Sequence, residues 1–427
     1  MNQEIYESYL EILKAELVPA LGCTEPIALA YAAALARKTL GCMPEHVDAQ
    51  CSGNIIKNVK SVTVPNSGGL RGIEAAVILG TVGGDADRSL EVLEDVDDAA
   101  REKTKQLLQT DFCSCSLAEN VANLYIHIEA SGNGHTASVW IENTHTNVRR
   151  IEKDGKVLYT GEKAEAVRDL SKAKELLSVK EILNFADTLD CKDVEEVLGR
   201  QIEMNSKISK EGLSHGYGAE VGRTLLQMYG EDVKVRARAA AAAGSDARMN
   251  GCPLPVIINS GSGNQGMTCS LPVIVYAQEL GASKDKLYRA LAVSNLTAIH
   301  QKRYIGSLSA YCGAVCAACG AGAGIAYLYG MDYEGVSRTI TNTIANIGGV
   351  VCDGAKSSCA AKIASAVDAA IMAVMMEREN RHFKSGEGLV KENVEATIQN
   401  YGYVGRVGMK STDVTILNLM IDKVKPV

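Results

Sequence analysis

The sequence of 427 residues predicts an α+β protein, in which a large all-helical domain accompanies a smaller inserted α/β domain containing an antiparallel meander. Residues 123–160 alternate apolar and polar side chains around turns at 131–134 and 154–155, which is the pattern of antiparallel strands. Helical patterns dominate after Glu162. The chain also exceeds the usual length for one hydrophobic core, which predicts two or three domains.

The first 45 residues predict two helices that belong to the large domain. Residues 3–40 show a helical pattern that a turn interrupts between Leu21 and Pro26. Pro26 fits the first turn of the second helix, and Thr24 or Glu25 can cap it. Residues 47–64 then look strand-like around the insertion SGNIIKNVK. Residues 71–83 predict a helix, and residues 86–110 predict a charged, solvated helix.

The remaining boundaries follow from composition. We expect the small α/β domain to span residues 46–165 and the all-helical domain to span residues 166–427, with a junction near residue 171. Long loops are expected at 244–268 and 345–358. Residues 250–278 and 305–331 carry no charge, but Gly, Pro and polar residues break them, so they predict buried helices and loops rather than membrane spans.

The composition excludes several classes of partner. A net charge of −7 argues against nucleic acid or an anionic membrane. The N-terminus lacks the pattern of a signal peptide, so we expect a cytoplasmic protein whose thirteen cysteines are mostly reduced. The expected partner is a small molecule, and the sequence leaves the oligomeric state open, with a homodimer as one option. Aromatic residues are scarce and glycine abundant, which predicts closely packed helices.

Three cysteines stand out by their surroundings. Cys312 lies in SLSAYCGAVCAACGAGAG, and Cys352 and Cys359 lie in IGGVVCDGAKSSCAAKIASAV. Glycine-rich turns at helix starts leave backbone N–H groups free to bond sulfur and lower thiol pKa values, as a metal cluster requires. The alternative is that these are buried structural thiols, since no dense ferredoxin run exists. Cys316 and Cys319 lie in an Ala/Gly helix and are expected to pack.

Two polar, glycine-rich loops are candidates for binding an anion. One contains Asn54 and is followed by Lys57, and the other contains Asn264 and Gln265. The alternative is that both are simple turns, and neither has a phosphate-binding signature. The histidines show no zinc spacing, and we expect His145 at the surface or in a turn of the meander and His300 on the surface.

Several separate motifs carry a family resemblance. LGCTEPIALAYAAA, SGNIIKNV, NSGSGNQGMTCSLP, YCGAVCAACGAG and GGVVCDGAKSSCAAKIA together resemble the L-cysteine desulfidase family, which is related to the iron–sulfur L-serine dehydratase alpha chain. The resemblance implies a [4Fe-4S] cluster held by Cys312, Cys352 and Cys359, with one iron open to substrate. It implies a β-eliminating lyase that converts L-cysteine to sulfide, pyruvate and ammonia.

The chain departs from the related dehydratases at its end. L-Serine dehydratases of this type end in a cysteine that caps the open iron, whereas this chain ends Asp-Lys-Val-Lys-Pro-Val. The departure favours the desulfidase branch and leaves the fourth ligand of the resting cluster open. L-Serine or L-threonine dehydration on the same cluster is the alternative activity, and a non-catalytic iron–sulfur sensor or scaffold is the alternative class.

β-Elimination also needs a base and groups that hold the amino acid. Cys23, at a helix start where the dipole favours a thiolate, is the candidate base, and the family motif agrees. Glu25 is the rival base, with a helix cap as its structural role. Asn54, Lys57, Asn264 and Gln265 are the expected substrate-binding residues. No lysine lies in a Schiff-base context with a phosphate loop, which disfavours a pyridoxal-phosphate enzyme.

Overall fold

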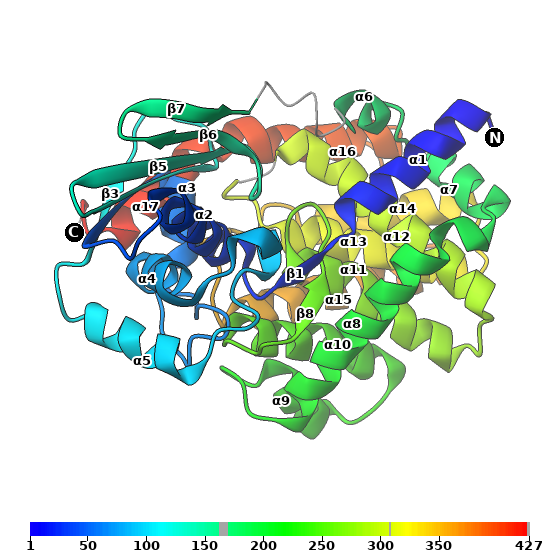
Figure 1. Cartoon of the computed structure of the whole chain (residues 1–427). Helices are drawn as coiled ribbons and strands as arrows, with labels where there is room; N and C mark the ends of the chain where they lie inside the picture. The colour runs from blue at the N-terminus through cyan, green and yellow to red at the C-terminus, as the bar shows by residue number, and fades with distance from the viewer. Residues whose placement is uncertain (162–169, 307–308, 425–427) are drawn as a thin grey trace.

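The computed structural model describes residues 1–161, 170–306 and 309–424. It consists of a six-stranded sheet with its covering helices and a large helical assembly (Figure 1). The predicted α+β class, with a dominant helical part and a smaller part that contains an antiparallel meander, is confirmed.

The sheet has the strand order β3-β2-β4-β5-β6-β7. Its strands are β2 (His46–Cys51), β3 (Cys113–Leu117), β4 (Tyr125–Gly132), β5 (His135–Glu142), β6 (Val148–Lys153) and β7 (Lys156–Thr160). Strands β4 to β7 form the predicted meander, whereas β2 pairs antiparallel with β4 and parallel with β3. Side chains of β4 alternate between buried and half-buried, which gives the sheet one apolar face.

Two helices cover this apolar face. Helix α2 (Thr24–Leu40) packs on β4 and β5, and α4 (Ile73–Gly83) packs on α2. A Cβ at Gly80 would lie 2.3 Å from the carbonyl oxygen of Ala30, so the close approach of these helices requires glycine at this position. The scarcity of large side chains therefore serves backbone packing, as expected from the composition.

Two predicted elements in this region are wrong. The expected strand of residues 47–64 ends at Cys51, because Ser52 begins the short helix α3 (Gly53–Val59). The expected single helix of residues 86–110 is the 3-10 turn η1 (Ala86–Glu91) followed by α5 (Asp98–Leu107). Asp97 starts the second element, since its side chain accepts a hydrogen bond from the amide of Ala100.

The helical assembly contains most of the remaining chain. Its elements are α1 (Gln3–Glu16), α6 (Leu170–Glu175), α7 (Val179–Thr188), η2 (Cys191–Val194), α8 (Glu195–Ser214), α9 (Val221–Tyr229), α10 (Val233–Met249), β8 (Pro255–Ile257), α11 (Gly263–Glu279), α12 (Lys284–Ile305), α13 (Gly313–Leu328), α14 (Tyr333–Ile347), α15 (Cys359–Arg378) and α16 (Val394–Tyr403). The predicted loop at 345–358 is confirmed within three residues of its start, whereas the loop at 244–268 is shorter, running from α10 to α11.

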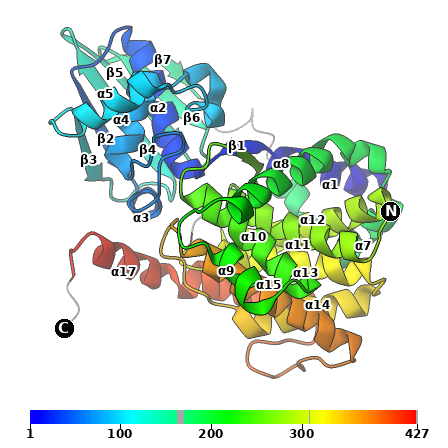
Figure 2. The ribbon, with the colours of Figure 1, turned by 90° about the horizontal axis from the view of Figure 1, so that it is seen from below.

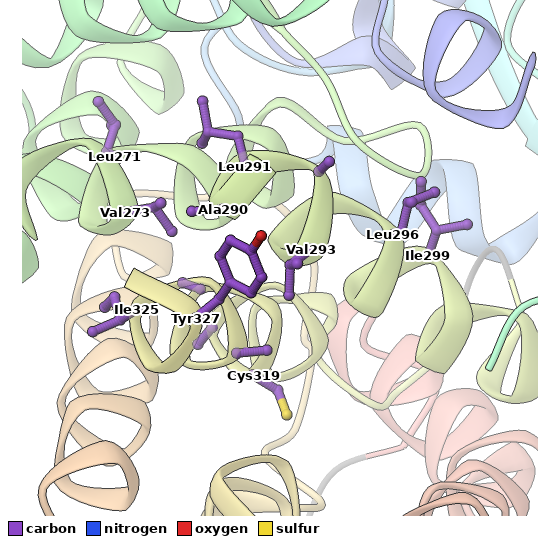
Figure 3. Packing of buried hydrophobic residues seen from close by; sticks show 14 of the residues in the cluster. Leu271, Val273, Ala290, Leu291, Val293, Leu296, Ile299, Cys319, Ile325 and Tyr327 are labelled. Atoms are coloured by element: carbon purple, nitrogen blue, oxygen red, sulfur yellow. The ribbon is translucent and has the colours of Figure 1, made fainter. Parts of the chain in front are cut away.

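Helices α11, α12 and α13 form the centre of this assembly. Figure 3 shows Val293, Leu296 and Ile299 of α12 lying among apolar side chains that include Ile325 and Cys319 of α13. Backbones also approach closely here, since a Cβ at Gly320 would lie 2.3 Å from the carbonyl oxygen of Ser294. The Ala/Gly-rich sequence of α13 thus lets a rigid helix pair form beneath the loops that precede it.

The two N-terminal helices, α1 and α2, belong to different hydrophobic clusters. Tyr9 and Leu13 of α1 belong to the cluster of the helical assembly, whereas Ile27 and Leu29 of α2 belong to the cluster of the sheet. Between them, β1 (Pro19–Leu21) pairs antiparallel with β8. We therefore propose a first domain boundary near β1 rather than at residue 45. The expected boundary between residues 165 and 166 lies outside the described residues.

One helix, α15, is long and apolar enough to cross a membrane by length and composition alone. Core helices of soluble proteins pass the same test, so this is weak evidence. Ile363, Val367 and Ile371 of α15 are buried in the cluster of the helical assembly. The helix therefore packs as an interior element in this structure.

The chain ends in a segment that leaves the helical assembly. After α16, the π-helical turn η3 (Val404–Gly408) leads into α17 (Lys410–Met420). Figure 2 shows α17 extending from the assembly toward α3 of the sheet region, and the two helices are in contact. This segment makes a further contact between the two parts of the molecule.

Candidate active site

A cavity of about 680 Å³ lies between the sheet region and the helical assembly. Both parts contribute polar and sulfur-bearing side chains to its wall. These include Cys23, Glu25, Lys57, Asn58, His145, Arg248, Asn264, Gln265, Lys302, Cys312, Cys352, Cys359 and Arg406. The three cysteines selected from the sequence therefore face the same space as Cys23 and Glu25.

Backbone pairing explains how two distant segments bring Cys312 and Cys352 together. The amide of Cys312 donates to the carbonyl of Val350 at 2.9 Å, and the amide of Cys352 donates to the carbonyl of Ala310 at 2.6 Å. Tyr311 and Val351 form an antiparallel bridge between these contacts. The two thiols are consequently neighbours although forty residues separate them in the chain.

The third thiol comes from the start of α15. Cys359 is the first residue of that helix, and its Sγ lies 3.7 Å from the carbonyl oxygen of Gly354. Gly354 has a φ of 92° and lies so close to α3 that a Cβ would come 2.3 Å from the carbonyl oxygen of Lys57. Glycine is required here on both grounds, and the turn it makes directs Cys352 and Cys359 to one side.

The electrostatics of the three thiols are coupled. A hydrogen bond between the thiols raises the pKa of Cys312, and the same bond lowers the pKa of Cys352, with the Lys57 ammonium as a further lowering cause. Burial, opposed by nearby backbone and lysine charges, raises the pKa of Cys359. Lys302 is 7% exposed, and burial lowers its pKa against the attraction of Cys316, Cys352 and Cys312. Two lysines thus bring positive charge to a place where thiolates would gather.

This donor set fits an iron–sulfur cluster better than a single ion. All thirteen cysteines are free thiols. In the described ranges, no group of three or more His, Cys, Asp or Glu side chains is arranged to hold one metal ion. Three thiols that line one cavity, at glycine-rich turns and helix starts, are donors of the type that an iron–sulfur cluster uses.

Cys23 and Glu25 form a hydrogen-bonded pair that lines the same cavity. The Sγ of Cys23 lies 3.1 Å from the Oε2 of Glu25, and the Nδ2 of Asn58 donates to the other carboxylate oxygen at 2.9 Å. Thr24 adds a third donor at 3.1 Å. The carboxylate is therefore held by three donors, all of which favour its ionised form.

The proton of this pair resides on sulfur. Burial and then the Glu25 carboxylate raise the pKa of Cys23 well above its ordinary value, so the expectation that the helix start makes it a thiolate is wrong. Burial alone would raise the pKa of Glu25, but His145, Cys23 and Arg248 outweigh it and lower that pKa. Because burial lowers the pKa of His145, the imidazole is neutral near pH 7, and the lasting stabilisers of Glu25 are Cys23, Asn58 and Arg248.

Arg248, in the last turn of α10, is a cavity residue that the sequence analysis missed. Its side chain is 2% exposed, and its Nε has no hydrogen-bond partner within the described residues. A Cβ at Gly263 would come 2.3 Å from that Nε, so glycine at the start of α11 makes room for the guanidinium. A buried arginine that faces a cavity is suited to binding a carboxylate. The glycine-rich loop was the only signal, and it did not point to α10.

His145 also lines the cavity, and it lies in a turn of the meander, which is one of its two expected positions. The loop between β5 and β6 carries it, and a Cβ at Gly261 would lie 3.5 Å from its ring. Its Nε2 is buried without a hydrogen-bond partner in the part of the chain that the structure describes. His300 is likewise buried rather than exposed, because its Nε2 pairs with Glu395 at 2.6 Å. The alternating pattern of the strands could not show which connecting loops of the sheet face the helical assembly.

The four expected substrate-binding residues separate into two groups. Lys57, Asn264 and Gln265 line the cavity, and the side-chain oxygens of Asn264 and Gln265 are buried without partners among the described residues. Asn54 lies on α3 like Lys57, but it is not among the described residues that line the cavity. Three of the four residues are thus brought to one place.

Comparison with known proteins relates the chain to one family. A family model described as serine dehydratase alpha chain matches residues 87–418. A UPF0597 protein of Lachnoclostridium phytofermentans is 54% identical over 98% of this chain and all of its own length. UPF0597 proteins of Desulfitobacterium hafniense and Finegoldia magna are 52% and 47% identical, each over 98% of this chain and 97% and 100% of their own.

Proposed function

Since this chain belongs to the serine dehydratase alpha chain family and is a dehydratase-like lyase acting on a small molecule, we propose that it converts L-cysteine to sulfide, pyruvate and ammonia. The observation that carries the proposal is that Cys312, Cys352 and Cys359 line one cavity together with the pair of Cys23 and Glu25. A β-elimination needs a group that takes the leaving atom on one side of the substrate and a base for the Cα proton on the other.

The three cavity thiols would hold a [4Fe-4S] cluster. Their chemistry and free state suit such a cluster, and members of this family generally depend on iron and sulfur. When bound, the cluster supplies a Lewis-acidic iron for the leaving sulfur. Lys57 and Lys302 would offset the negative charge that three thiolates bring into this buried region.

Cys23 and Glu25 would together take the Cα proton. The pair contains one proton, which resides on sulfur, so the carboxylate is its vacant acceptor. Passing the thiol proton over 3.1 Å to Glu25 makes Cys23 a strong base at the moment of reaction. The Cα–H bond then breaks toward the Cys23 sulfur, and the Cβ–S bond breaks with its electron pair leaving on hydrosulfide. One of the two protons then on the pair leaves with the hydrosulfide as hydrogen sulfide, which restores the single proton, and water converts the aminoacrylate product to pyruvate and ammonia.

The amino acid needs fixed partners for its carboxylate and ammonium. Arg248 is buried beside the pair, and a guanidinium matches a carboxylate with two parallel hydrogen bonds. Lys57 adds a second positive charge on the side of the thiols. The unpartnered oxygens of Asn264 and Gln265 are acceptors suited to the ammonium group.

L-Serine or L-threonine dehydration remains the second candidate activity, because the family name points to a hydroxyl as the leaving group. Steady-state rates with L-cysteine, L-serine and L-threonine on one anaerobic preparation distinguish the two. We expect kcat/KM to be highest for L-cysteine. A higher kcat/KM for L-serine would replace the desulfidase by the dehydratase, and no turnover of any of the three by iron-loaded protein would leave a non-catalytic iron–sulfur sensor or scaffold.

The thirteen free thiols support a cytoplasmic location, where cysteines are kept reduced. We propose a homodimer as the assembly, and sedimentation of the reduced protein tests this oligomeric state. A monomer at micromolar concentration would rule the dimer out.

A further inference from the structure

Helix α17 reaches from the helical assembly to α3 and contacts it through one face. Asp413 pairs with Lys57, the side chain of Leu417 packs at Gly53, and the carbonyl of Met420 accepts a hydrogen bond from Lys60. Positions 413, 417 and 420, with spacings of four and three residues, lie on one face of α17. The contacted positions 53, 57 and 60 have the same spacing on α3. The contact is therefore a helix-to-helix interface, with the ion pair as its charged element.

The ion pair is unusual because one partner belongs to the cavity. The Lys57 side chain is 2% exposed and that of Asp413 is 19% exposed. Lys57 lines the cavity and lies close enough to the thiols to lower the pKa of Cys352. Within the described residues, Asp413 is the only acidic side chain that pairs with Lys57. A buried ammonium group without its counter-charge is strongly disfavoured, so Asp413 governs how Lys57 is held.

The other contacts of this segment anchor it to the half that carries the thiols. Met409 and Ile416 pack in a small cluster with Tyr311 and Cys316, which flank Cys312 in the chain. Apart from these contacts, α17 is weakly embedded, because none of its residues is buried. The segment is thus held mainly by two contacts, one near the loop that carries Cys312 and one at Lys57.

From these contacts we propose that Asp413 is a positioning residue, which holds the Lys57 ammonium at the cavity across the boundary between the two parts of the molecule. This inference rests on the proposed function, in which Lys57 helps to bind the anionic amino acid. The carboxylate of Asp413 does not touch the substrate. It restricts Lys57 to one rotamer, so that the ammonium group is ready when substrate arrives.

The test compares Asp413→Asn, Asp413→Glu and the control Asp422→Asn in the full-length, iron-loaded protein. Asp422 lies just beyond α17, is exposed, and has a φ of 57°, a conformation that asparagine adopts readily. For Asp413→Asn we expect a KM for L-cysteine that rises about tenfold or more, with kcat within about twofold and iron content unchanged, which is the pattern of lost uniform binding. Asp413→Glu should recover most of the affinity, and Asp422→Asn should match the wild type.

A second readout does not depend on turnover. Brief acylation with an amine-reactive ester, followed by peptide mass spectrometry, measures the accessibility of Lys57 relative to Lys423, whose side chain is 53% exposed. Labelling of Lys57 should increase several-fold in Asp413→Asn alone. Unchanged KM and labelling would overturn the proposal, as would equal loss of iron, kcat and thermal stability in Asp413→Asn and Asp413→Glu, which would mean a general brace. If the wild type turns over no amino acid, the proposed function fails, and the labelling alone decides the role of Asp413.

Discussion

The thiol of Cys23 donates a hydrogen bond to the carboxylate of Glu25, with 3.1 Å between Sγ and Oε2. Both groups are buried, yet the pKa of the carboxyl is lowered and the pKa of the thiol is raised, so the pair contains one proton on sulfur. The hydrogen bond gives the thiol proton a path to the carboxylate, while the order of the two pKa values keeps that proton on sulfur at rest.

Replacing Cys23 by serine should abolish turnover without removing iron. A serine hydroxyl keeps the hydrogen bond to Glu25 but is far too weak a base near neutral pH, so kcat should fall on the order of 10² or more. The variant should also stop exchanging the Cα hydrogen of L-cysteine with deuterated solvent, which nuclear magnetic resonance follows directly. A changed visible spectrum without substrate would instead identify Cys23 as a cluster ligand, and full activity of Cys23→Ala would remove it from the mechanism.

The proton count of the pair predicts the pH dependence. Since the pKa of Glu25 is lowered, the carboxylate stays ionised at and above its ordinary range, and since the pKa of Cys23 is raised, the thiol stays protonated through neutral pH. The protonation state of the pair is therefore constant from about pH 6 to about pH 9, and kcat should be flat there. A kcat that climbs about tenfold per pH unit over this range would mean that a scarce free thiolate sets the rate, contrary to internal transfer.

Arg248→Lys should weaken substrate binding. Lysine keeps the charge but cannot form two parallel hydrogen bonds to a carboxylate, so KM should rise about tenfold or more while iron content stays constant. Arg236→Lys is the matched control, because Arg236 lies on the same helix α10 but pairs with Glu279 at the surface. Equal KM values for the two variants would exclude Arg248 as the carboxylate partner.

Single serine substitutions at Cys312, Cys352 or Cys359 should each remove the cluster. The anaerobic wild type should contain about four irons and about four sulfides per chain and be brown, whereas each variant should lose most of both. Serine at Cys113, Cys115 or Cys191 is the control, since these cysteines lie away from the cavity. Retention of full iron in any of the three ligand variants would exclude that residue as a ligand.

Local sequence could predict the thiol positions but not the partners across the cavity. Cys312 and Cys359 lie at helix starts, the first beside Gly313 and the second five residues after Gly354, which is a pattern visible in the chain. The meander of residues 123–160 has a clear alternation. No local sequence pattern distinguishes Arg248 or Asp413 from other charged residues. Their importance arises from packing between segments far apart in the chain, which no local periodicity encodes.

The direction of the pKa shift of Cys23 could not be predicted from local sequence either. A helix start favours a thiolate when the site is open to solvent, and this is what the sequence suggested. Burial and a carboxylate oxygen 3.1 Å from the sulfur reverse the direction of the pKa shift, and both come from the folded structure. Similarly, the segment SGNIIKNVK looked like an insertion in a strand-like region, because its short apolar run fits either period, whereas in the structure it forms α3 and packs against α17 and Gly354.

The central claim is that the three thiols hold an iron–sulfur cluster at which L-cysteine is cleaved. The most direct test is anaerobic incubation of iron-loaded protein with L-cysteine, with sulfide and pyruvate measured in the same sample and Cys352→Ser as the matched control. We expect the wild type to release sulfide and pyruvate in a one-to-one ratio over many turnovers, and Cys352→Ser to release neither. Wild-type protein with a full complement of iron that forms no sulfide and no pyruvate, or a Cys352→Ser variant that forms both at the wild-type rate, would contradict it.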